Sequence, residues 1–138
     1  MWRIIRKIGV QMSDKYYNFL AEFMLPEKRE RIIFQLTSKK KRDNAFDKMT
    51  AFQDCFNSKY IYLDISHYED DDAIMAIEKA TASKNCFSLE LNEILSIKNA
   101  YKRAVNSSML DILIIDENTI VYIGEYEYGA SEKHILGK

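Results

Sequence analysis

The spacing of apolar residues predicts helices in the first part of the chain. From Ser13 onward they recur at the i, i+3, i+4, i+7 positions of an amphipathic helix that ends before Pro26. The same proline suits the first turn of a second helix, and a third follows the sequence TSKKKRDNAF. The predicted buried stripes are Tyr16, Phe19, Leu20, Phe23 and Met24, then Ile32, Ile33 and Leu36, then Ala45, Phe46, Met49, Phe52 and Phe56.

After residue 58 the period changes, and strands are predicted to alternate with helices. KYIYLDIS alternates apolar and polar residues like a half-buried strand, and CFSLEL does the same. Between them a helix is expected from Asp70 to Ser83, with Ile74, Ile77 and Ala80 inward. Another helix ends near Val105 and begins after either Asn92 or Ser96; its stripe is Ile97, Ala100, Tyr101, Ala104 and Val105.

The last part of the chain predicts a hairpin. MLDILIID and TIVYIGEYEY flank Glu117 and Asn118, which form the expected turn. The near-continuous apolar run from Met109 to Ile115, interrupted only by Asp111, is typical of a central strand. GASEKHILGK is expected either to add a short strand or to lack regular structure.

This order of elements indicates an α/β (or α+β) fold. We expect N-terminal helices followed by a small mixed sheet of about four strands, with two helical crossovers and a C-terminal β-hairpin. With no repeat or linker to divide it, the chain is interpreted as a single globular domain, residues 1–138.

Composition indicates a folded cytoplasmic protein. Apolar residues make up 47% of the chain and charged residues 30%, while Cys55 and Cys86 match neither a zinc site nor a disulfide framework. Residues 1–10 fit a strand or a helix but hold no apolar run long enough for a signal peptide or membrane span, and Met12 is an alternative start.

Charge is unevenly distributed along the sequence. The net charge is −1, but residues 1–48 hold 12 Lys+Arg against 6 Asp+Glu, and residues 49–138 hold 8 against 15. The basic run Lys39 to Arg42 is interpreted first as a solvated face, with a protein partner or an anion as alternatives. The acidic remainder of the chain argues against nucleic acid as a partner.

The sequence SHYEDDDA concentrates carboxylates at a predicted helix start. Acidic side chains in a first turn face the positive end of the helix dipole. Successive helical residues point about 100° apart, so the run Glu69 to Asp72 cannot converge on one ion. His67 and Asp64 follow a strand, at the edge where α/β folds bind ligands, which keeps a functional alternative open.

A second carboxylate pair lies in GEYEYG. In a strand Glu125 and Glu127 would share one face, and Tyr126 and Tyr128 the other. Such a pair can do acid–base chemistry, but charge on a terminal strand also prevents edge-to-edge aggregation, and we favour the second interpretation.

Asp111 together with Glu125-Tyr126-Glu127 resembles the metal-binding core of the PD-(D/E)xK nucleases. The resemblance covers less than a fifth of the chain and implies a metal held by Asp111, Glu125 and Glu127. Glu127 stands where that family has a lysine, which is a departure at the catalytic position. With a two-residue turn Asp111 would pair with Gly124, whereas a three-residue turn would place it opposite Glu125.

Two functional hypotheses follow. The favoured one is a non-catalytic protein-binding module, without a cofactor, that presents an acidic, tyrosine-rich surface to a basic protein. Bacterial immunity proteins, which neutralise a toxin or nuclease, are of this physical kind. The expected partner-binding residues are Tyr68, Glu69, Asp70, Asp71, Asp72, Glu125, Tyr126, Glu127 and Tyr128. The alternative is a metal-dependent hydrolase or nuclease with ligands Asp111, Glu125 and Glu127.

Overall fold

The computed structural model describes residues 13–126 and 131–138, and the backbone divides into two compact units. One unit ends at Lys59 and the other begins at Tyr60. The single domain predicted for residues 1–138 stays a prediction. The alternatives for residues 1–10, and the alternative start at Met12, lie outside the described residues.

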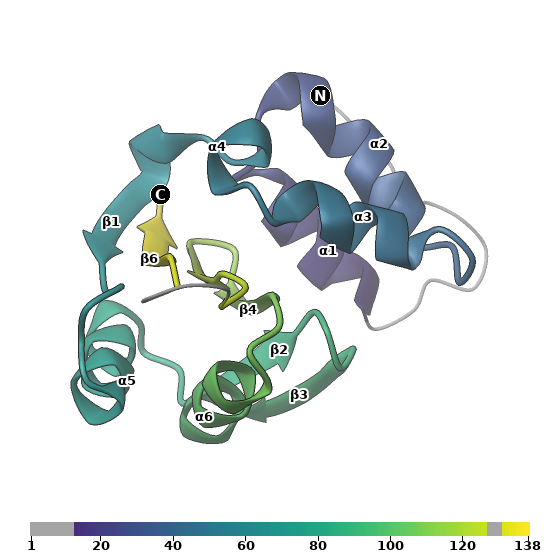
Figure 1. The fold of residues 1–138 in the computed structure, drawn as a ribbon. Coiled ribbons are helices and arrows are strands. Elements are labelled where there is room, and N and C mark those ends of the chain that lie inside the picture. Colours follow the sequence, from purple (N-terminus) through teal and green to yellow (C-terminus); the bar gives the residue numbers. More distant parts are fainter. Residues whose placement is uncertain (1–12, 127–130) are drawn as a thin grey trace. The chain divides into compact units, whose positions relative to one another are not determined.

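The first unit is helical. It contains α1 (Ser13–Ala21), α2 (Pro26–Leu36), α3 (Arg42–Met49) and the short α4 (Phe52–Cys55). Pro26 is in the first turn of α2, as predicted, because its missing N–H has no partner to lose there. Helix α2 contacts both α1 and α3, and α4 contacts α3 (Figure 1).

The third predicted helix is divided in two. Helix α3 ends at Met49, and Thr50 Oγ1 donates a hydrogen bond to the Asp47 carbonyl 2.8 Å away. Ala51 is extended before α4 begins. The predicted stripe still turns inward, because Met49, Phe52 and Phe56 are buried. The apolar spacing was therefore informative about burial and wrong about helix continuity.

The second unit contains a sheet and two helices. Its strands are β1 (Ile61–Asp64), β2 (Asn85–Ser88), β3 (Glu93–Ser96), β4 (Asp111–Asp116), β5 (Thr119–Ile123) and β6 (Lys133–Gly137). They form a six-stranded sheet in the order β1-β6-β5-β4-β2-β3. The mixed helix-and-sheet class is confirmed, with six strands in place of about four.

The expected parallel neighbours are not found, since each described strand pair is antiparallel. The two helical crossovers are nevertheless present: α5 (Asp70–Ala80) connects β1 to β2, and α6 (Ile97–Ser107) connects β3 to β4. Each crossover joins strands that run in the same direction but are separated by antiparallel strands. Strand β6, for example, lies between β1 and β5.

Strand β3 was missed by the sequence analysis, which left the start of the following helix open. Ser96 resolves that alternative: its Oγ accepts a hydrogen bond of 3.1 Å from the Asn99 amide, so it caps α6. The residues before this cap pair with β2 through a tight connection in which Asn92 has a positive φ of 59°.

Helices α5 and α6 pack against one face of the sheet (Figure 1). Their predicted stripes are confirmed, because Ile74, Ile77, Ile97 and Tyr101 all lie in this core. Strands β4 and β5 are buried along nearly their whole length, as expected for the centre of a sheet. No helix within residues 13–126 or 131–138 has the length and apolar character needed to cross a membrane.

Candidate protein-binding surface

The acidic turn, defined as residues 68–72, forms the start of α5. Glu69 has an extended backbone immediately before the helix, and Asp70, Asp71 and Asp72 occupy its first turn. All five side chains of the turn are exposed. The carboxylates are favourable there, because they face the positive end of the helix dipole. The predicted helix start is therefore confirmed.

Most carboxylates of the acidic turn have no ion-pair partner among the described residues. Asp71 Oδ1 lies 3.9 Å from Lys102 Nζ on α6, a surface ion pair that contributes little to stability. Across the part of the chain that the structure describes, the side chains of Glu69, Asp70 and Asp72 make no hydrogen bond or ion pair. Their charge is available to a positively charged partner.

A buried hydroxyl lies close to this turn. Tyr101 on α6 has 0% of its surface exposed, and its Oη has no hydrogen-bond partner among the described residues. Burial raises the pKa of Tyr101, and the nearby charge of Asp70 raises it further. The hydroxyl is thus an unsatisfied polar group beside the acidic turn.

Two exposed apolar side chains accompany the carboxylates. Tyr68 is 40% exposed and Met75 is 53% exposed. Met75 lies one helical turn after Asp71, on the outer side of α5. Sequence analysis missed it, although one signal was present: Met75 falls out of phase with the inward positions Ile74 and Ile77. A surface of this composition combines steering charge with apolar contact area.

The other predicted patch is only partly described. Glu125 and Tyr126 are exposed after the end of β5, and the Tyr126 amide donates a hydrogen bond of 3.1 Å to the Ser108 carbonyl. Glu127 and Tyr128 lie outside the described residues, so their role stays a prediction. No hydrogen bond or ion pair among the described residues joins Glu125 or Tyr126 to the acidic turn.

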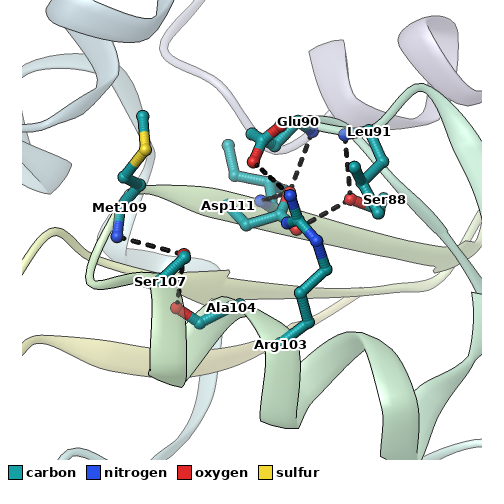
Figure 2. A network of polar contacts seen from close by, with 9 residues as sticks. Ser88, Glu90, Leu91, Arg103, Ala104, Ser107, Met109 and Asp111 are labelled. Atoms are coloured by element: carbon teal, nitrogen blue, oxygen red, sulfur yellow. Dashed lines mark hydrogen bonds and ion pairs between the residues drawn. The ribbon is translucent and has the colours of Figure 1, made fainter.

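Asp111 is an internal carboxylate, with 2% of its surface exposed. Ser88 Oγ donates to its Oδ2 at 2.7 Å, and the Glu90 amide donates to Oδ1 at 3.0 Å (Figure 2). The Ile112 amide also donates to Oδ1, at 2.7 Å. Burial raises the pKa of Asp111, and these hydrogen bonds partly oppose the rise. The carboxylate oxygens of Asp111 thus accept hydrogen bonds that stabilise the connection after β2.

The hairpin register differs from both of the registers predicted from the sequence. Asp111 pairs with Ile123, neither with Gly124 nor with Glu125. The turn has two residues, as predicted, but the register shifts between Ile114 and Asp116 and moves the rest of the pairing by one position.

The geometry required for the predicted metal site is therefore not found. Among the residues that the structure describes, no three His, Cys, Asp or Glu side chains gather in an arrangement that could hold a metal ion. Glu127, the remaining ligand of that hypothesis, lies outside them.

Asp64 at the end of β1 belongs to a polar cluster along β1 and β6. Ser66 Oγ donates to Asp64 Oδ1 at 2.5 Å and accepts a bond of 2.9 Å from the Lys133 amide. The Ser66 amide also donates to Asp64 Oδ1, at 3.0 Å. The hydrogen bonds from the Ser66 hydroxyl and amide lower the pKa of Asp64, with smaller effects of His134 and His67. His134 Nε2 lies 2.7 Å from Glu132 Oε2 and its Nδ1 lies 3.7 Å from Asp64 Oδ1.

This cluster was missed from sequence, although Glu132 and His134 have the i, i+2 spacing that places strand residues on one face. It does not resemble a nucleophile–base pair. A catalytic serine must hydrogen-bond its histidine base, whereas Ser66 bonds Asp64 and the β6 backbone. The arrangement ties β1 to β6, and the functional alternative for His67 gains no support from it.

The basic loop, defined as residues 39–42, lies in the first unit. Lys39, Lys40 and Lys41 are exposed and lie between α2 and α3, with Lys41 immediately before α3 and Arg42 its first residue. Phe34, 58% exposed, lies beside the loop, with Lys41 Nζ 5.6 Å from its ring centroid.

Comparison with protein-family models, with curated proteins and with solved structures gave no match.

Proposed function

We propose that this protein is a non-catalytic binding module that uses its acidic turn to bind a basic protein. One observation carries the proposal: exposed carboxylates without ion-pair partners among the described residues lie next to the exposed apolar side chains Tyr68 and Met75. Complementary charge accelerates association and selects the partner, and apolar side chains at the centre supply contact area.

Neutralisation of a basic toxin or nuclease, as by bacterial immunity proteins, is the role within this class that we propose. Such a role needs a stable scaffold with charge on its surface, and it needs no metal or nucleophile. A basic protein encoded by a neighbouring gene is the natural candidate partner.

The metal-dependent hydrolase receives less support. Asp111 is buried and its oxygens accept hydrogen bonds from Ser88, Glu90 and Ile112. A metal ion would have to displace these donors. This hypothesis predicts that millimolar Mg²⁺ or Mn²⁺ binds to Asp111 and so raises the melting temperature of the protein. An unchanged melting temperature would count against it.

The binding proposal is tested by co-expression with basic products of neighbouring genes, followed by affinity capture. The test variant carries Asp70→Lys, Asp71→Lys and Asp72→Lys. A matched control changes three exposed glutamates, Glu27, Glu30 and Glu93, to lysine, which alters the net charge equally. We expect capture to be lost in the first variant and kept in the second.

Circular dichroism of both variants shows whether the fold is retained. If the folded Asp70, Asp71, Asp72 variant captures the basic protein as well as the wild type does, the acidic turn is not the binding surface. Replacing Met75 with Ala separates the two contributions: we expect a faster dissociation rate with little change in association rate, because Met75 carries no charge.

A further inference from the structure

The two units carry opposite charge. The unit that ends at Lys59 holds 13 Lys+Arg against 7 Asp+Glu, a net of +6. The unit that begins at Tyr60 holds 7 against 14, a net of −7. The sequence therefore gives the two units net charges of opposite sign, and opposite charges on two molecules attract each other.

The basic loop and the acidic turn have similar construction. In the basic loop, consecutive cations stand beside the exposed ring of Phe34. In the acidic turn, consecutive carboxylates stand beside Tyr68 and Met75. Each surface thus offers a row of like charges and an apolar contact, and the signs of the two rows are complementary.

Much of this charge has no partner among the residues that the structure describes. In the described ranges, Lys39, Lys40, Asp70 and Asp72 make no side-chain hydrogen bond or ion pair. Beside Asp70, the buried Oη of Tyr101 also lacks a hydrogen-bond partner there.

We propose that the basic loop of one copy docks on the acidic turn of a second copy, head to tail. This inference rests on the proposed role of the acidic turn as the surface that binds a basic protein. A second copy fits better than a nucleic acid, because the acidic unit would repel a polyphosphate, whereas a second copy supplies both signs of charge.

The proposed contact has two physical consequences. It is heterologous, so a bound pair of copies leaves one free acidic turn and one free basic loop, and association continues until a ring closes. It is also screened by salt, because the interacting charges are exposed; at about 1 M salt the Debye length falls to about 3 Å.

Light scattering coupled to size exclusion tests the inference on the full chain. At low ionic strength and high protein concentration, we expect the wild type to have a mass above the 16.2 kDa of one chain, and at high salt to return to it. One variant reverses the acidic turn with Asp70→Lys, Asp71→Lys and Asp72→Lys. A second reverses the basic loop, with each residue from Lys39 to Arg42 replaced by Glu.

Each variant alone is expected to run as a single chain, because its two surfaces now carry the same sign. Mixed in equal amounts, the two variants should associate, since one keeps the native basic loop and the other the native acidic turn. The control with Glu27, Glu30 and Glu93 changed to lysine should associate like the wild type.

A wild type that remains a single chain at low salt would overturn the inference, as would folded variants that fail to associate when mixed. Neither result bears on the capture of a separate basic protein, which is measured at a protein concentration too low for copies to associate. The two proposals can therefore fail independently.

Discussion

Asp111 allows the sharpest test of how the second unit is held together. Replacing it with Ala removes the acceptor for the hydroxyl of Ser88, the last residue of β2, and for the amide of Glu90 in the connection that follows. A buried donor left without a partner costs about 1–3 kcal/mol. The Ser88 hydroxyl can rotate, so the cost of removing its acceptor lies at the lower end of this range. For the two donors together we expect the free energy of unfolding to fall by about 2–4 kcal/mol.

Asp111→Asn is the matched control. It keeps the shape of the side chain and one oxygen acceptor but removes the charge. Because burial raises the pKa of Asp111, the charged form is disfavoured in the fold, and the neutral amide should cost far less than Ala at neutral pH. We expect Asn to be close to the wild type in the free energy of unfolding.

The pH dependence gives a second check. Since the folded state raises the pKa of Asp111, it binds this proton more tightly than the unfolded chain does. The resulting stabilisation is fully present below the unfolded pKa, about 4, and is lost as pH rises through the folded pKa. The Asn variant has no such proton, so the wild type should lose stability relative to it as pH rises through this window.

Urea denaturation followed by circular dichroism measures all three proteins, with the slope m unchanged if only stability has changed. If the Asp111→Ala variant were as stable as the wild type, the hydrogen bonds to Asp111 would not stabilise the connection after β2. If the Asp111→Ala and Asp111→Asn variants were equally destabilised, the loss of stability would come from the missing charge and not from the missing acceptor.

Three further substitutions test separate features by the same measurement. Tyr101→Phe removes a buried hydroxyl without a described partner and should raise the free energy of unfolding by about 1 kcal/mol; a clear loss would mean that the hydroxyl is satisfied. Ser96→Ala removes the cap of α6 and should cost about 1 kcal/mol. Gly124→Ala places a Cβ 2.8 Å from the Glu132 carbonyl oxygen and should cost about 1–3 kcal/mol, whereas Gly137→Ala, with no atom nearer than 3.7 Å, should cost less.

Local patterns predicted the elements whose buried face is continuous. Helix α5 has Ile74 and Ile77 at helical spacing, and β1 alternates between half-buried and exposed residues, so both were found from sequence alone. Helix α3 was overextended because the apolar spacing continues through Phe52 and Phe56 without showing the interruption at Thr50. Spacing reports which side is buried and does not report where a backbone bends.

Local sequence patterns did not predict which strand residues pair with one another. The residues before α6 gave no clean alternation, and their pairing with β2 depends on a connection in which Asn92 has a positive φ. The pairing of Asp111 with Ile123 depends on a shift between Ile114 and Asp116 that two apolar strands do not reveal. The acidic turn was found because four consecutive carboxylates are visible in sequence, while Met75 became apparent only when its exposure was known.

The place of β6 in the sheet has a consequence for how the second unit is made. Among the described strands β1 pairs with β6 alone, and the Ser66–Lys133 hydrogen bonds that accompany this pairing join residues 67 positions apart. Contacts of such separation slow folding, because a long segment must be ordered before they can form. During synthesis β1 and β5 would wait for residues 133–137 to leave the ribosome, and a nascent chain halted before them would leave β1 unpaired and one edge of β5 exposed to a chaperone.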